Sequence, residues 1–267
     1  MTRVILHTGF HKTGTTTLQR FMMRNRDALA PFCTFWNRAE LASSLNAARR
    51  YGWAPNTWRL FQFRRAFRAD IKTLPKTETL VLSREAFSGG VPGFRPNHGP
   101  RVLGYTQTAP RLAKVIIEEL QNRLGTDTEI SLFYTLRDRE AWISSLYKRH
   151  LRTSRMTDSF ETFNAALPPD LCTAKTAAFL KSALAPHSVT TARLEEYQKG
   201  PNACAPALLD LLNVPKDVRN SLQSVSQRNV SQSVDLNPAF LRLNGSSLSD
   251  AEVIAQKHAL MNPDQGA

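Results

Sequence analysis

The sequence predicts a three-layer α/β fold, in which helices cover both faces of a mainly parallel central sheet. Short apolar runs alternate along the chain with longer segments of helical periodicity, as expected for parallel strands joined by crossover helices. The first apolar run leads into a glycine-containing loop and then into a helical segment, which predicts a P-loop-type phosphate-binding loop after the first strand. A chain of 267 residues is long enough to bury the core of such a domain.

Each element follows from a local pattern. Strands are expected at residues 4–7, 79–83, 130–136 and 188–193 because these are short apolar runs. Helices are expected at residues 15–26, 112–124, 206–212, from about Asp138 and from Pro238 onward. Asp138 is a good N-cap residue, and Gly125 is a typical helix stop.

Two regions depart from this alternation. Residues 49–72 are basic and aromatic, and apolar side chains recur there at helical spacing: Leu60, Phe63, Phe67 and Ile71. This spacing favours an amphipathic surface helix with a solvated basic face, although the segment would also suit one wall of a site for an anionic substrate. Residues 89–104 are rich in glycine and proline, which predicts a loop of the kind that often borders an active site.

Composition limits the function classes. The chain has 35 Lys and Arg against 22 Asp and Glu, a formal charge of +13, which suits nucleic acid, an acidic membrane surface or a small anionic substrate. No motif of a nucleic-acid-binding module is apparent, so we expect no nucleic-acid partner. The three cysteines have no CxxC spacing, so neither a disulfide framework nor a structural zinc site is expected. No apolar run approaches the roughly 20 residues of a membrane span, and we expect a cytoplasmic protein.

The strongest motif is Gly-Phe-His-Lys-Thr-Gly-Thr-Thr-Thr at residues 9–17. Glycines let a backbone approach a phosphate, a helix N-terminus offers free N–H groups, and the lysine adds a full positive charge. The alternative is a tight turn with solvated threonines. We expect phosphate contacts from these residues: His11, Lys12, Thr13, Gly14, Thr15, Thr16 and Thr17.

This loop is not a Walker A sequence, because the lysine comes two residues before Gly14 instead of directly after it. The order Lys-Thr-Gly-Thr-Thr resembles the 5′-phosphosulfate loop of sulfotransferases that use 3′-phosphoadenosine 5′-phosphosulfate (PAPS). A second motif agrees with this resemblance: Arg137 follows a predicted strand, and Ser145 lies eight residues later. In the family, an arginine and a serine at this spacing hold the 3′-phosphate.

The resemblance implies transfer of a sulfuryl group from PAPS to a hydroxyl or amine of an acceptor, with release of adenosine 3′,5′-bisphosphate (PAP) and no need for a metal. The Arg-Lys-Gly triplet of small-molecule sulfotransferases is not found. The chain therefore looks closer to the bacterial carbohydrate or heparan-type branch, and a glycan or other polar molecule is the expected acceptor. We expect one sulfotransferase-like domain over residues 1–267, with residues 235–267 as a peripheral, mostly helical tail.

Roles are assigned by position. Lys12 would stabilise the departing phosphate oxygen. The base that takes the acceptor proton would be Glu85, which follows the strand at 79–83, with His11 or His98 as alternatives. Arg228 would add a charge at the 3′-phosphate.

Two other functions remain open at this stage. A P-loop kinase or nucleotide hydrolase would need an acidic residue after a strand to hold Mg²⁺, and here Arg137 stands before Asp138. A non-catalytic anion- or glycan-binding relative of the fold would keep the charges without the reaction.

Overall fold

The structure is a computed structural model that describes residues 2–96, 99–197, 200–225 and 236–262. Within these residues it contains a five-stranded sheet in the order β2-β3-β1-β4-β5. The strands are β1 (Arg3–His7), β2 (Thr34–Trp36), β3 (Thr79–Ser83), β4 (Glu129–Leu136) and β5 (Val189–Arg193). Every pairing is parallel, so the predicted α/β class is confirmed.

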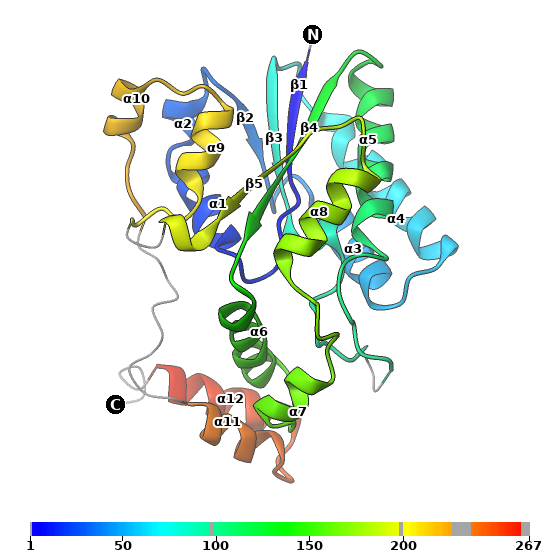
Figure 1. The fold of residues 1–267 in the computed structure, drawn as a ribbon, viewed down its shortest axis with the longest axis vertical. Helices are drawn as coiled ribbons and strands as arrows, with labels where there is room; N and C mark the ends of the chain where they lie inside the picture. The colour runs from blue at the N-terminus through cyan, green and yellow to red at the C-terminus, as the bar shows by residue number, and fades with distance from the viewer. Residues whose placement is uncertain (1, 97–98, 198–199, 226–235, 263–267) are drawn as a thin grey trace.

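The helices are distributed over both faces of the sheet and below its lower edge (Figure 1). Their bounds are α1 (Thr15–Arg24), α2 (Arg26–Leu29), α3 (Ala42–Trp53), α4 (Thr57–Asp70), α5 (Ala109–Leu124), α6 (Arg139–Thr153), α7 (Phe160–Ala165), α8 (Thr173–Ala183), α9 (Ala205–Leu211), α10 (Lys216–Ser221), α11 (Asn237–Asn244) and α12 (Asp250–Met261). Short 3-10 turns lie at η1 (Ile71–Thr73), η2 (Glu85–Ser88) and η4 (Leu194–Tyr197).

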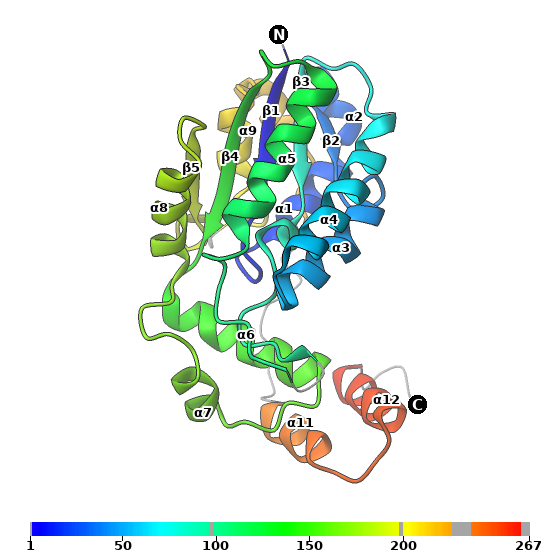
Figure 2. The same ribbon diagram turned by 90° about the vertical axis from the view of Figure 1, so that its right-hand side faces the viewer.

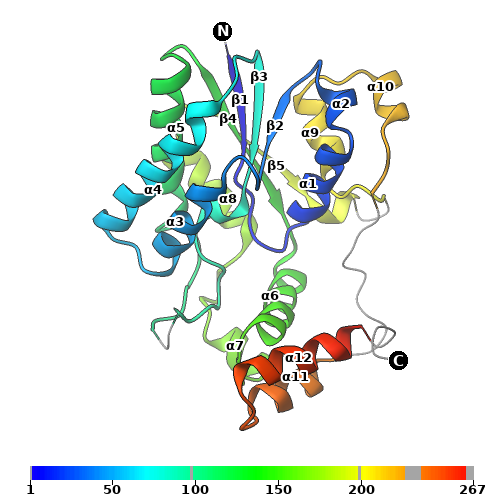
Figure 3. The ribbon, with the colours of Figure 1, turned by 180° about the vertical axis from the view of Figure 1, so that it is seen from behind.

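Alternating side chains of the strands build two cores. Val4 and Leu6 of β1 pack with the helices α3, α4, α5 and α8 on one face, whereas Ile5 between them packs with α1, α2 and α9 on the other. Figure 3 shows the same two helical layers from behind. A strand that is covered on both faces reads as a continuous apolar run, which explains why the short runs predicted the strands.

Local capping explains several helix ends. The Asp138 side chain accepts hydrogen bonds from the amides of Glu140 at 3.0 Å and Ala141 at 3.3 Å, so the predicted N-cap of α6 is confirmed. Gly125 is the C-cap of α5. The first helix ends at Arg24, two residues earlier than predicted, because the Asn25 side chain exchanges hydrogen bonds with the backbone of Gln223.

The expectation of one surface helix over residues 49–72 was wrong. Residues 54–56 separate α3 from α4, and the Asn56 side chain caps α4 by accepting from the Arg59 amide at 2.8 Å. The basic face of α4 is also not simply solvated. Arg64 and Arg68 both bind the buried carboxylate of Glu119 in α5, at 3.1 and 2.7 Å.

The C-terminal helices α11 and α12 lie against the far end of α6 instead of against the sheet (Figure 2). The buried Lys257 ammonium donates to the carbonyl oxygens of Leu151 at 2.6 Å and Ser154 at 2.9 Å. Asn244 donates to the same Leu151 carbonyl at 3.2 Å. A cation on the last carbonyls of a helix is stabilising, so these two helices hold the end of α6 in place.

Candidate functional site

The candidate site lies where β1, β3 and β4 end, at the lower edge of the sheet in Figure 1. In parallel sheets, ligands bind outside the carboxyl ends of the strands. β1 leads into the 8–14 loop, β3 leads into Arg84 and Glu85, and β4 leads into Arg137. The strands neighbour one another in the order β3-β1-β4, so the loop stands between Glu85 on one side and Arg137 on the other.

The backbone of the loop includes three residues with positive φ angles. Gly9, Lys12 and Gly14 have positive φ angles of 22°, 70° and 88°. The φ of Gly14 favours glycine because other residues rarely adopt it, and a Cβ there would also lie 2.9 Å from Leu194 Cδ1. Gly14 is the N-cap of α1 and makes no side-chain cap, which leaves the first N–H groups of the helix without a side-chain acceptor. These groups are available to an anion.

The threonines of the loop have different surroundings. The Thr13 hydroxyl is buried, donates to the Phe10 carbonyl oxygen at 2.7 Å and lies 2.6 Å from the Thr135 hydroxyl of β4. It therefore holds the loop to the sheet, and only its backbone amide is left for a phosphate. Thr15 and Thr17 are buried, whereas Thr16 is exposed.

The structure brings Arg137 to the loop. Arg137 Nη1 donates to the Lys12 carbonyl oxygen at 3.1 Å, and its backbone amide donates to Thr173 Oγ1 at 3.0 Å. Its Nε atom is buried and has no hydrogen-bond partner within the described residues. Ser145 is half-buried in the second turn of α6. The pKa of Lys12 is lowered to about 8. Burial is the main cause, and the charges of Arg152, Arg149 and Arg137 act in the same direction.

His11 is held by two aromatic side chains that the sequence did not point to. The Trp142 indole donates to the His11 carbonyl oxygen at 2.8 Å. The Tyr105 hydroxyl lies 3.1 Å from the His11 amide and 3.0 Å from its Nδ1 atom. Burial lowers the pKa of His11 although Glu85 opposes this, and the charges of Arg149 and Arg49 lower it further. His11 is therefore neutral at pH 7.

Glu85 begins η2, directly after β3. The Gln19 amide donates to its Oε2 atom at 3.1 Å and to Ser83 Oγ at 3.1 Å. Burial acts to raise the pKa of Glu85, but His11, Arg84, a backbone amide and the Gln19 hydrogen bond together hold it well below the usual range. His7 of β1 is also buried, with Nδ1 2.7 Å from Ser83 Oγ.

The remaining candidate residues add nothing further to the description of the site. His98 and Arg228 lie outside the described residues. Among the residues that are described, no group of His, Cys, Asp and Glu could hold a metal ion, and no helix is long and apolar enough to cross a membrane.

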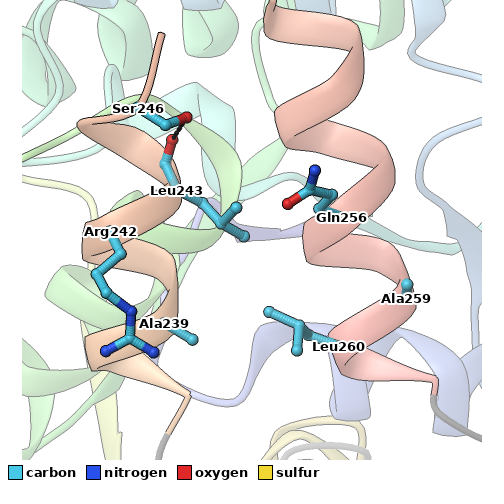
Figure 4. A pocket seen from close by; sticks show the side chains of 7 residues that line it. All are labelled: Ala239, Arg242, Leu243, Ser246, Gln256, Ala259 and Leu260. Atoms are coloured by element: carbon cyan, nitrogen blue, oxygen red, sulfur yellow. Dashed lines mark hydrogen bonds between the residues drawn. The ribbon is translucent and has the colours of Figure 1, made fainter. Parts of the chain in front are cut away.

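A pocket of about 550 Å³ lies between α11 and α12 (Figure 4). Its lining is mostly apolar, and Arg242 is its one charged member among the described residues.

Sequence reasoning missed Gln19, Tyr105, Arg84 and Arg149 as members of the site, whereas Arg49 belongs to the 49–72 segment, whose alternative prediction is a wall of an anion site. One signal could have found Arg149, because it lies seven residues after Trp142 and four after Ser145. This spacing puts the three side chains on one face of a helix. Gln19 and Arg84 are close in the chain to the predicted loop and to Glu85, whereas Tyr105 reaches the site only through the packing of a distant segment.

Comparison with known proteins gives limited information. No protein-family model and no curated protein matches the chain. Among solved structures, the chain is similar to a sulfotransferase from Alicyclobacillus acidocaldarius, with 16% sequence identity and a TM-score of 0.45 over 97% of this chain and 95% of that one. Identity and score at this level leave the assignment of function to the site residues themselves.

Proposed function

We propose that the chain is a sulfotransferase that moves a sulfuryl group from PAPS to a hydroxyl or amine of an acceptor, preferably a carbohydrate. The observation that supports this most is the hydrogen bond from Arg137 to the Lys12 carbonyl oxygen. It joins two motifs that are 125 residues apart in the chain, each of which resembles one half of a PAPS site.

The residues present fit PAPS. The amides at the start of α1 and the Lys12 ammonium would hold the 5′-phosphosulfate, and Arg137 with Ser145 would hold the 3′-phosphate. The buried Arg137 Nε has no partner within the described residues, as expected for a donor whose acceptor belongs to a ligand. PAPS supplies a sulfuryl group attached to a phosphate leaving group.

Lys12 has the charge that the leaving group needs. With a pKa of about 8, it is mostly protonated at pH 7. The dianionic phosphosulfate group would stabilise this protonated form further. A cation beside the bridging oxygen stabilises the negative charge that develops there as the sulfuryl group departs.

The hydrogen bonds around His11 favour Glu85 as the base. The Tyr105 hydroxyl oxygen accepts from the His11 amide, so its proton is free to be donated to His11 Nδ1. With Tyr105 as the donor to Nδ1, the proton of the neutral imidazole would be on Nε2, and His11 would be a donor toward the transferring group. Glu85 is ionised and oriented by Gln19, so it would accept the proton of the acceptor.

The proposal has three further parts, which come from the same resemblance to PAPS-dependent sulfotransferases. The reaction needs no metal, the protein works in the cytoplasm, and Arg228 extends the 3′-phosphate contacts. None of them is required by the role of Lys12 or Glu85.

The test is thermal unfolding with PAP, compared with ATP plus Mg²⁺. A ligand at 100 times its dissociation constant adds about 2.7 kcal/mol to the unfolding free energy, which is readily measured. We expect stabilisation by PAP and little by ATP with Mg²⁺. The opposite order would favour a kinase or nucleotide hydrolase, and stabilisation by neither would overturn the nucleotide site.

A further inference from the structure

Arg149 of α6 lies over the phosphate loop. Trp142 binds the His11 carbonyl oxygen, and Arg149 follows it by seven residues, or two turns, on the same face of the helix. The next residue, His150, is fixed by a 2.8 Å contact between its Nε2 and the Pro92 carbonyl oxygen. In agreement with this position, the Arg149 charge lowers the pKa of both His11 and Lys12.

Arg49 belongs to α3, the helix that packs against η2. A Cβ on Gly52 would lie 2.1 Å from the Gly90 amide nitrogen, so α3 touches the segment after η2 backbone to backbone. Arg49 lies one turn before Gly52 on the same face and is therefore directed to η2, which begins with Glu85. The Arg49 charge acts on His11, Arg84 and Arg149.

Arg84 is a third arginine of this region, next to Glu85 in the chain and fully buried. It is 0% exposed, and its Nε, Nη1 and Nη2 atoms have no hydrogen-bond partner within the described residues. A buried guanidinium without partners is costly, and its nearby charges are Glu85, Arg38 and Arg49.

Positive charge is therefore in excess around Glu85 and the loop. Neither Arg49 nor Arg149 forms an ion pair within the described residues, and Glu85 is the carboxylate whose charge acts on both Arg149 and Arg84. An anion between two guanidinium groups relieves their repulsion and accepts their hydrogen bonds.

We propose that Arg49 and Arg149, with the added charge of the buried Arg84, form a second anion-binding position that holds a phosphate, sulfate or carboxylate group of the acceptor. The order β3-β1-β4 supports the separation of the two positions. Arg137 follows β4 and serves the nucleotide, whereas η2 and α3, which carries Arg49, lie on the β3 side of the loop. Arg149 comes from α6, which follows β4, and its charge acts on both His11 and Lys12. The assignment to the acceptor rests on the proposed function, because it takes the nucleotide to occupy the Lys12 and Arg137 side.

The test uses protein saturated with PAP and titrates it with inorganic phosphate, sulfate or acetate, at ionic strength matched with potassium chloride. The readout is the rise in melting temperature with anion concentration. The variants are Arg49→Gln and Arg149→Gln. Their controls are Arg50→Gln and Lys148→Gln, which remove the same charge from an exposed neighbour on the same helix.

We expect at least one of the three anions to stabilise the PAP complex, and the concentration for half of the effect to rise at least tenfold in Arg49→Gln and Arg149→Gln but not in the controls. The anion that acts best identifies the group on the acceptor. Equal responses in variants and controls, or a response that disappears as PAP saturates, would overturn the proposal. If PAP has no effect but the anion response still depends on Arg49 and Arg149, the anion position stands and the proposed function fails.

Discussion

Gly52 of α3 and Gly90, which follows η2, are in backbone contact, and a Cβ on Gly52 would lie 2.1 Å from the Gly90 amide nitrogen. The contact joins the helix that carries Arg49 to the segment that follows Glu85. A real Cβ cannot be accommodated unless one of the two backbones moves.

The first prediction concerns this contact. Alanine is a better helix former than glycine by about 1 kcal/mol, but we expect Gly52→Ala to lower the unfolding free energy by about 2 kcal/mol, because overpacking against backbone costs more than this gain. Chemical denaturation measures the change. The control is Gly245→Ala, where the nearest atom would be 3.6 Å away and little change is expected. A Gly52→Ala protein as stable as the wild type would contradict the close contact.

The second prediction concerns Arg137. Removal of a charged donor to a phosphate costs about 1.5–3 kcal/mol, so Arg137→Ala should reduce the preference for PAP over AMP by roughly ten- to a hundredfold. Calorimetric titration with both nucleotides measures the ratio. Arg137→Lys, which keeps the charge and loses the planar fork, should fall between. The exposed Arg111→Ala is the control for net charge, and an equal loss of PAP and AMP binding in Arg137→Ala would contradict a role at the 3′-phosphate.

The third prediction separates Glu85 from His11 as the base. Glu85→Gln should lower the rate of PAP release from PAPS in the presence of an acceptor by about 10²–10⁴-fold, while the dissociation constant for PAP changes little. Glu129→Gln, exposed at the opposite end of the sheet, serves as control. If Glu85→Gln retains full activity and His11→Gln does not, the assignment of the base moves to His11.

The features that could be predicted are local in the chain. The 9–17 loop, the strands around it and the Asp138 cap each depend on residues within one short segment, and strand ends that share an edge of a parallel sheet then bring Lys12, Glu85 and Arg137 together. The sequence therefore predicts which residue types meet at the site without knowledge of the packing.

The features that were missed depend on distant segments. β2 (Thr34–Trp36) has three residues and too short a pattern to be recognised. Arg64 and Arg68 read as solvated because their partner, Glu119, belongs to α5 and is buried only when α4 packs on it. Tyr105 reaches His11 from a loop 94 residues away, and no spacing in the sequence indicates it.

The fourth prediction concerns stability against acid. Burial lowers the pKa of His7 and of His150 from 6.5 to about 4, so the folded protein binds fewer protons than the unfolded chain between these values. Each of these histidines contributes stability that is fully present above pH 6.5 and is lost as the pH falls toward 4, by about 1.4 kcal/mol per pH unit.

His150→Gln tests this, because a glutamine amide can still donate to the Pro92 carbonyl oxygen in place of His150 Nε2. Burial is the main cause of the His150 shift; Arg149 and Arg101 add to it, and Pro92 opposes it. We expect the slope of unfolding free energy against pH to decrease by about 1.4 kcal/mol per unit between pH 6.5 and 4. His258→Gln, an exposed histidine of α12, is the control, and unchanged slopes in both variants would show that His150 is not the source.

The fifth prediction uses the pKa of Lys12, which burial lowers to about 8, with the charges of Arg152, Arg149 and Arg137 acting in the same direction. In the proposed site, the protonated ammonium would bind the nucleotide and the neutral amine would not. The dissociation constant for PAP should therefore be constant near pH 7 and increase above pH 8, by at most tenfold per pH unit. Lys12→Arg stays charged in this range, so its dissociation constant should be flat to pH 9.5 even if it is weaker throughout. Parallel curves for the wild type and Lys12→Arg would mean that another group titrates and that Lys12 does not contact the nucleotide.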